Sequence, residues 1–147
     1  ITEKSVQDTS KVRTVLECMA IDSAVFPLSE AKLQELERID REQHELIVTH
    51  PEDNLRFAEL DKEFHCAIAE CCDNASLIEF IQSINNVMVR FNVLSGTLPQ
   101  NRQDALIEHE NIIAFLKKGQ REFAKVALSE HLKHVEERML SESKKER

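Results

Sequence analysis

The sequence contains very little of what a β-sheet protein needs. Among its 147 residues there are two glycines, three prolines, no tryptophan and no tyrosine. Sheet proteins are rich in turn residues and in aromatic or β-branched side chains. The residues that abound here instead, Leu, Ala, Glu, Lys and Gln, lose little side-chain freedom in a helix. The composition therefore predicts an all-α protein, and the length suits a single domain spanning residues 1–147.

Three further absences narrow the class of protein. The net charge is −8 and the basic residues form no stripe, so we do not expect the chain itself to neutralise nucleic-acid phosphates. No apolar run approaches the length of a membrane span, and no signal-peptide pattern is present. Four cysteines in a chain of this length do not indicate a disulfide scaffold. We therefore expect a protein of the reducing cytoplasm.

Six amphipathic segments with short breaks between them account for the chain. The expected helices run from Lys4 to Val25, from Ser29 to His50, from Pro51 to about Cys72, from Asn74 or Ser76 to the loop Ser95–Pro99, from that loop to Gly119, and from about Arg121 into the charged tail Glu142–Arg147, which we expect to fray. Short connections favour antiparallel neighbours. The predicted architecture is a single antiparallel bundle of six to seven helices, whose first helix turns an apolar stripe to the core at Val12, Val15, Leu16, Met19 and Ala20.

Four polar residues interrupt the apolar stripes of three predicted helices. Asp61 and His65 are four residues apart and so share one helical face. His109 and His131 each have apolar residues one turn before and one turn after them. Carboxylate and imidazole together suit zinc, nickel, iron or manganese, and a helical bundle builds metal sites from facing helices. Spacing alone leaves open that each residue is merely a polar group satisfied near the core.

The other histidines and the cysteines show no such pattern. Cys66, Cys71 and Cys72 follow His65 closely, but adjacent cysteines do not share a ligand face and no Cys-x-x-Cys motif occurs. A free cysteine commonly packs as a small hydrophobe. His44 lies on a charged face, and His50 precedes Pro51 in a break. We therefore assign none of these residues to the site.

Several motifs, in one order, resemble a known family. Leu60-Asp61-x-x-Phe64-His65 is followed by Glu108-His109-x-x-Ile112-Ile113-x-x-Leu116-x-x-Gly119, and then by Ala124-x-x-Ala127 with His131 and Leu132. The opening Val12-Arg13-x-x-Leu16-Glu17 extends the resemblance over nearly the whole chain. Together they resemble the FCD effector domain of the FadR subfamily of GntR transcription regulators, which implies an all-helical bundle of six or seven helices and a homodimer.

The resemblance also implies a ligand set and a function. It implies that Asp61, His65, His109 and His131 hold one divalent metal ion, zinc first, with nickel, iron or manganese as alternatives. These ligand types belong to the metal-binding branch of the family, not to the branch that binds acyl-CoA. The pocket would bind a small carboxylate or sugar acid that switches an N-terminal winged helix-turn-helix on or off DNA. We expect that DNA-binding segment before Ile1 in the full regulator.

Arginine is our candidate for binding the acid group of the effector, because guanidinium matches a carboxylate with two hydrogen bonds. We expect Arg13 first and Arg138 second, with Arg90 and Arg102 after them. For each of them a surface ion pair is the alternative. His134, three residues after His131, is expected at the pocket rim or on the surface, where it can touch the effector.

Two other functions compete with this interpretation. A metal-dependent hydrolase of the HD type would need a His-Asp dipeptide, and a di-iron bundle would need Glu-x-x-His twice; the sequence has neither. Glu108 and Glu110 flank His109 but point away from its helical face, so no general acid or base is evident. We therefore do not expect an enzyme. The second alternative is a structural bundle in which the histidines are only core residues.

Overall fold

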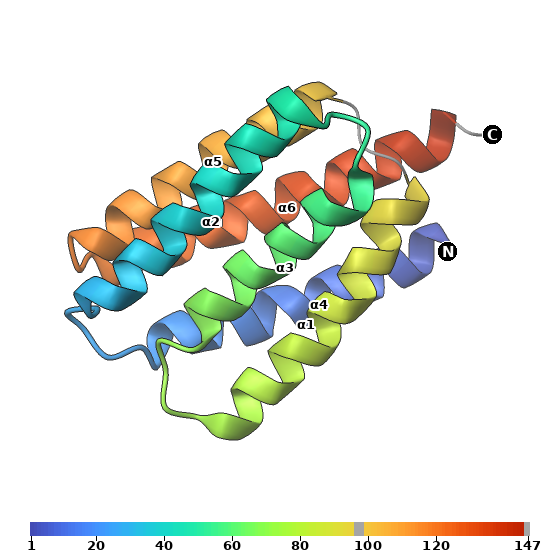
Figure 1. Cartoon of the computed structure of the whole chain (residues 1–147). Coiled ribbons are helices and arrows are strands. Elements are labelled where there is room, and N and C mark those ends of the chain that lie inside the picture. The colour runs from blue at the N-terminus through green and yellow to red at the C-terminus, as the bar shows by residue number, and fades with distance from the viewer. Residues whose placement is uncertain (96–98, 146–147) are drawn as a thin grey trace.

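Six helices make up the part of the chain that this computed structural model describes, residues 1–95 and 99–145 (Figure 1). They are α1 (Glu3–Asp22), α2 (Glu30–Thr49), α3 (Asn54–Ala69), α4 (Ala75–Ser95), α5 (Pro99–Lys117) and α6 (Arg121–Lys145). Within those ranges the only β-type pairing is an isolated bridge between Ala24 and Cys72. The predicted all-α bundle is confirmed.

Side-chain caps define several helix ends where the sequence placed them. Ser29 accepts a hydrogen bond from the backbone N–H of Lys32 at the start of α2, and Asn74 accepts one from Leu77 at the start of α4. Gly119 follows α5 with a φ of +69°, the left-handed conformation that favours glycine after a helix. Three predicted boundaries are therefore confirmed.

Two predicted helices are too long. α1 ends at Asp22, not Val25, and α3 ends at Ala69, not Cys72. The two segments that follow these ends pair with each other, since the N–H of Val25 donates to the carbonyl of Cys71 at 3.0 Å. Backbone groups that would have continued each helix are thus used between the segments.

The remaining boundaries also shift. α3 begins at Asn54 rather than Pro51, because the side chain of Asp53 accepts from the N–H of Arg56 and caps the helix there. Ser95 ends α4 and Pro99 begins α5, so only residues 96–98 of the predicted loop separate them, and these lie outside the described residues. The predicted fraying of the C-terminal tail is not tested, since α6 continues to Lys145 and residues 146–147 are not described.

The helices lie side by side, and Figure 1 shows both chain ends at the same end of the bundle. α1 packs against α6, α4 and α3, α2 packs against α3 and α5, and α5 also packs against α6. Across the described ranges, no helix combines the length and the apolar character needed to cross a lipid bilayer. This packing brings α3, α5 and α6 around a common interior.

Two of the three apolar clusters among the described residues lie at different levels of that interior. The larger includes Leu36, Phe64 and Ile112, and the smaller is built on Val6, Met88 and Met139. α1 contributes Val6 to the smaller cluster and Ile21 to the larger, and its buried polar residues lie between these two positions. A polar layer therefore separates the two clusters.

The buried face of α1 differs from the predicted one. Val12, Val15 and Met19 are exposed at 51%, 61% and 45% of their surface, while Arg13 and Glu17 are buried at 1% and 2%. The two charged side chains contact buried polar groups of other helices, and those contacts, not the apolar stripe, orient the helix. The predicted inward orientation of Val12, Val15 and Met19 is wrong.

Arg121 joins the end of α1 to the start of α6. Its Nη1 donates to the carbonyl oxygens of Ile21, Asp22 and Ala24 at 2.7–2.9 Å. The guanidinium also lies 4.8 Å from the centre of the Phe26 ring. Arg121→Ala should lower the free energy of unfolding by about 1–3 kcal/mol, because the carbonyls at the helix end lose their donor.

Urea denaturation measures this loss, with Lys118→Ala as the matched control. Lys118 is exposed at the same α5–α6 connection, and its replacement should change stability by less than about 0.5 kcal/mol. Equal effects of the two substitutions would contradict a specific role for Arg121.

Candidate metal centre

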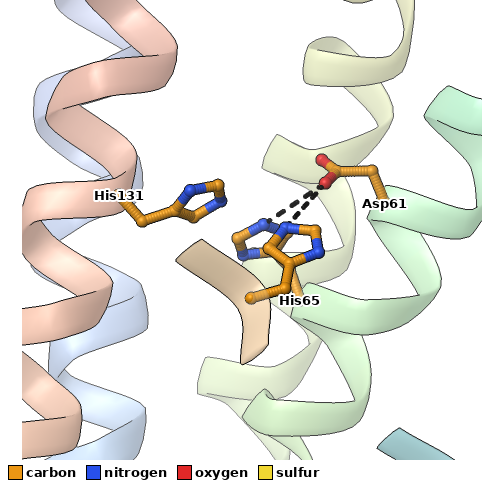
Figure 2. Close-up of side chains that lie close together, drawn as sticks. Asp61, His65 and His131 are labelled. Atoms are coloured by element: carbon orange, nitrogen blue, oxygen red, sulfur yellow. Dashed lines mark ion pairs between the residues drawn. The ribbon is translucent and has the colours of Figure 1, made fainter. Parts of the chain in front are cut away.

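The four residues singled out in the sequence come together between α3, α5 and α6. Asp61 and His65 lie one turn apart on α3, His109 is on α5 and His131 is on α6. Each offers a ligand atom, and the four atoms lie within 4.8 Å of one another. Figure 2 shows the carboxylate of Asp61 directed toward the ring of His65, with His131 facing them from α6. The structure thus assembles a group of metal-ligating side chains from three helices.

The inward-facing nitrogen of each imidazole lacks a partner. The Nε2 atoms of His65, His109 and His131 are buried and find no hydrogen-bond partner among the residues that the structure describes. Asp61 Oδ1 lies 3.2 Å from Nε2 of His109 and 3.8 Å from Nε2 of His65, without hydrogen-bond geometry. Buried polar atoms left unpaired are costly, and a cation bound by the three nitrogens and the carboxylate would remove that cost. The donor set therefore fits a divalent metal ion.

The outward-facing nitrogen of each ring is held by an oxygen acceptor. Nδ1 of His65 lies 2.5 Å from Glu17 Oε1, and Nδ1 of His131 lies 2.6 Å from Glu108 Oε1. Because both acceptors are carboxylate oxygens, each Nδ1 carries the proton, and the lone pair of Nε2 faces the centre.

The side-chain oxygen of Gln43 accepts from the outward nitrogen of the third imidazole, His109. Nδ1 of His109 lies 3.2 Å from Gln43 Oε1. The amide nitrogen of Gln43 donates to the carbonyl of Phe57 at 3.5 Å, which leaves Oε1 to accept. The ring of His109 also stacks on Phe64, with 4.0 Å between the centres and 17° between the planes. All three imidazoles are therefore fixed in the tautomer and orientation that metal binding requires.

The pKa shifts favour ionised carboxylates at Asp61 and Glu17 and neutral rings at His109 and His131. Burial alone would raise the pKa of Asp61 and of Glu17, but nearby charges outweigh it. His65 and His109 lower the pKa of Asp61 below its ordinary range, and His65 and Arg13 do the same for Glu17. Burial lowers the pKa of His109, and it lowers that of His131 to about 3 despite the contact with Glu108. Ionised carboxylate and neutral imidazole are the forms that bind metal.

Arg13 lies against this cluster from α1. Its Nε donates to Glu17 Oε2 at 2.6 Å and its Nη2 donates to Asn85 Oδ1 at 3.1 Å. Nη2 also lies 3.9 Å from Asp61 Oδ2. The guanidinium therefore connects α1 to α3 and α4 next to one of the four ligand residues.

Arg138 and His134 approach from the other side, through Glu108. Arg138 donates to both carboxylate oxygens of Glu108, at 3.0 and 2.8 Å, and Nδ1 of His134 lies 3.0 Å from Glu108 Oε2. Burial would raise the pKa of Glu108, but His131 and Arg138 lower it below its ordinary range. Glu108, His134 and Arg138 line a surface hollow of about 390 Å³ that also touches Ile107. Glu108 thus joins the buried His131 to the protein surface.

The other two arginines predicted to bind the effector lie elsewhere. Arg102 is buried at the start of α5, where it donates to the carbonyl of Pro51 and the side chain of Asn54. It also lies 5.5 Å from the centre of the Phe57 ring. Arg90 is exposed on α4. The structure does not bring either arginine to the cluster.

The cysteines lie outside the cluster as well. Cys72 packs in an apolar group with Ala20, Leu77 and Ile81. Burial raises the pKa of the Cys66 and Cys71 thiols to about 11, so both are protonated near neutral pH. Among the described residues, neither group of candidate metal ligands includes a cysteine.

Three residues that orient the imidazoles were missed by the sequence reasoning. Glu108 follows Ile107 on a helical face away from His109, yet its carboxylate contacts His131 on the next helix. Gln43 continues the buried spacing of Leu36 and Ile39 on α2, which is a signal that could have found it. Glu17 shares the buried face of α1 with Arg13, but the apolar stripe on another face concealed that spacing.

Comparisons with known proteins agree with this architecture. The sequence model of the FCD domain family matches residues 8–134. The chain is similar to the uncharacterized HTH-type transcriptional regulator YdhC of Bacillus subtilis (strain 168), with 28% identity over 142 residues, 92% of this chain and 63% of that protein.

Two solved structures share the fold. One is a GntR family transcriptional regulator from Pseudomonas syringae pv. tomato str. DC3000, with a TM-score of 0.73 and 19% identity over 100% of this chain and 62% of that one. The other is the metal-free FCD domain of TM0439, with a TM-score of 0.75 and 21% identity over 99% of this chain and 98% of that one. The chain therefore spans less than two thirds of the length of YdhC and of the Pseudomonas regulator.

Acid should destabilise the metal-free domain through this cluster. In the unfolded chain His131 takes up a proton near its ordinary pKa of 6.5, but in the folded chain only near 3. Between those values the unfolded state binds more protons, so stability falls as the pH falls. Lowering the pH from 7 to 5 in the presence of chelator should cost on the order of 1–2 kcal/mol through this group.

Thermal unfolding of wild type and of His131→Gln tests this expectation. Glutamine keeps a donor for Glu108 but does not titrate. The unfolding temperature of the variant should therefore fall less steeply than that of wild type between pH 7 and 5. His50→Gln, at an exposed histidine, should leave the decline unchanged. Constant stability of the wild type between pH 7 and 5 would contradict a lowered pKa of His131 in the folded chain.

Proposed function

The chain belongs to the FCD domain family, and we propose that it is the ligand-sensing domain of a bacterial GntR-family transcription regulator. In this proposal it binds one divalent metal ion and a small carboxylate or sugar-acid effector, and the effector modulates DNA binding. The observation that carries the proposal is the convergence of three buried, partnerless Nε2 atoms on the Asp61 carboxylate. The names of the similar proteins, which are transcriptional regulators, favour a regulatory role over an enzymatic one.

The metal would be held by Nε2 of His65, His109 and His131 and by the carboxylate of Asp61. Zinc is the first candidate for this donor set, and nickel, iron and manganese accept the same donors. When bound, such an ion supplies a Lewis-acidic centre for the oxygens of an organic acid. The acceptors on the three Nδ1 atoms would keep the rings in place for it.

The charge of the cluster supports an anionic effector. Asp61 and Glu17 surround Arg13, and Glu108 is paired with Arg138. These three carboxylates and two guanidinium groups leave one excess negative charge, and a divalent ion would convert it into one excess positive charge. A buried excess charge is unfavourable unless it is compensated. The carboxylate of an effector would provide that compensation.

Of the arginines expected to bind the effector, Arg13 has the strongest support. It is buried, and its Nη2 lies 3.9 Å from Asp61 Oδ2. Arg138 and His134 have indirect support, because both contact Glu108, the partner of His131. Arg90 and Arg102 remain predictions without geometric support.

The proposal for the whole regulator extends beyond this chain. We propose that a winged helix-turn-helix domain outside these residues reads the DNA, that the regulator acts in the cytoplasm, and that it is a homodimer. The exposed apolar residues Val12, Val15 and Met19 on α1 offer a face for a second copy.

Arg13 offers a route from the pocket to α1. It ties α1 to Asp61 on α3 and to Asn85 on α4. An effector carboxylate that engages this guanidinium would compete with those contacts and change how firmly α1 is held. Such a ligand shifts the equilibrium only by its difference in affinity for the two arrangements.

Metal content of the untagged protein tests the first part of the proposal. We expect the four ligands Asp61, His65, His109 and His131 (the inner site) to take up about one equivalent of zinc or nickel after loading. In His109→Gln this uptake should fall to less than about a tenth of an equivalent, since a ligand is lost. His50→Gln serves as the control and should retain the wild-type content. Wild-type protein with no uptake of either metal would refute the metal site.

A thermal-shift screen of organic and sugar acids tests the second part. An effector should raise the unfolding temperature by mass action, and chelator should abolish the rise if the effector coordinates the metal. Arg13→Lys keeps the charge but not the planar fork, so it should weaken the response about tenfold with metal content unchanged. Arg41→Lys, at an exposed position of α2, is the control. Loss of metal from Arg13→Lys would count against its assignment to the effector.

A further inference from the structure

A second group of ligand-type side chains lies between α2 and α5, apart from the four residues described above. It consists of Asp40 and His44 on α2 and Glu110 on α5, whose ligand atoms lie within 4.8 Å of one another. Nε2 of His44 is 2.7 Å from Glu110 Oε1 and 3.6 Å from Asp40 Oδ1. One imidazole and two carboxylates from two helices therefore converge.

The group repeats the residue spacing of the inner site. It differs in that Nε2 of His44 is already paired with Glu110 Oε1 at 2.7 Å, so an ion would have to replace the proton of that contact. Asp40 and His44 are four residues apart, as Asp61 and His65 are on α3, and α5 supplies a further ligand in both cases. An aspartate and a histidine at this spacing present their side chains on one face of a helix. The outer group thus has two ligands fixed by one helix and a third fixed by its neighbour.

The burial of one oxygen points to a cation. Asp40 Oδ1 is buried, although the side chain as a whole is 16% exposed, and it finds no hydrogen-bond donor within the described part of the chain. A buried carboxylate oxygen without a donor is costly. Burial and the nearby Glu110 raise the pKa of Asp40, against the influence of His44 and His109. A proton or a bound cation at this oxygen would remove that cost.

The other two ligands are open to solvent. The side chains of His44 and Glu110 are 44% and 51% exposed. With a neutral imidazole the two carboxylates give the group two negative charges, which favour a divalent cation. An ion can therefore reach the group without any movement of the buried layer.

From this geometry we infer a second divalent-metal site, formed by Asp40, His44 and Glu110, on the outer side of the α2–α5 contact. Its one nitrogen and two oxygen donors suit zinc or manganese, and three protein ligands leave positions for water. The inner site touches the same helix pair through Gln43 and His109, so an ion in the outer site would hold α2 against α5 beside that contact.

Equilibrium titration with Zn²⁺ against a chromophoric chelator tests the outer site. Wild type should bind two equivalents of Zn²⁺. His44→Gln should bind one equivalent as wild type does, and its affinity for the second should be at least about tenfold lower. Asp40→Asn should give the same loss, because it removes the buried carboxylate. His50→Gln, at an exposed histidine away from the group, should bind as wild type does.

His131→Gln separates this inference from the proposed inner site. That variant should still bind one Zn²⁺, and Zn²⁺ should still raise its unfolding temperature, whereas His131→Gln combined with His44→Gln should bind none. If the inner site fails altogether, wild type should bind one equivalent that His44→Gln abolishes, and the outer site still stands. Equal Zn²⁺ binding by wild type and His44→Gln would overturn it and leave His44 and Glu110 as a simple ion pair.

Discussion

The burial of one carboxylate and three imidazoles in the middle of an apolar bundle is the constraint on which the rest of this structure depends. Asp61, His65, His109 and His131 are nearly inaccessible to water, so each polar atom must find a partner inside the protein. The outward nitrogens find Glu17, Gln43 and Glu108. The inward nitrogens find none in the described chain, and this asymmetry, which a fully satisfied polar core would lack, supports the proposed metal site.

Meeting that constraint ties all six helices together. Glu17 joins α1 to α3, Gln43 joins α2 to α5, and Glu108 joins α5 to α6. Arg13 adds α4 through Asn85. Removing one partner from a buried ionic pair typically costs 3–5 kcal/mol, because the other charge remains buried. The polar layer therefore connects all six helices, while the apolar clusters supply the hydrophobic stabilisation.

Sequence reasoning predicted the helices and the four candidate ligands for the same reason: both follow from local spacing. Breaks at Phe26–Leu28 and Gly119, and the one-turn separation of Asp61 and His65, are visible in a single segment. The partners of the imidazoles depend on contacts between helices, which periodicity does not report. α1 shows the limit most clearly, because it has apolar residues on one face and Arg13 and Glu17 on another. The contacts of Glu17 with His65 and of Arg13 with Asp61 accompany the burial of the polar face, and these contacts cannot be inferred from the spacing within α1.

A bundle divided by a polar layer is suited to sensing, because its helices are connected by charges that a ligand can rearrange. A continuous apolar core resists small changes, since close packing has few alternative arrangements. Here an added cation or anion would alter the balance among Asp61, Glu17 and Arg13 without repacking either apolar cluster. The effect would reach α1 through Arg13 and the surface hollow through Glu108 and Arg138. The groups that make the layer costly to bury are therefore the same groups through which the proposed ligands would act on the fold.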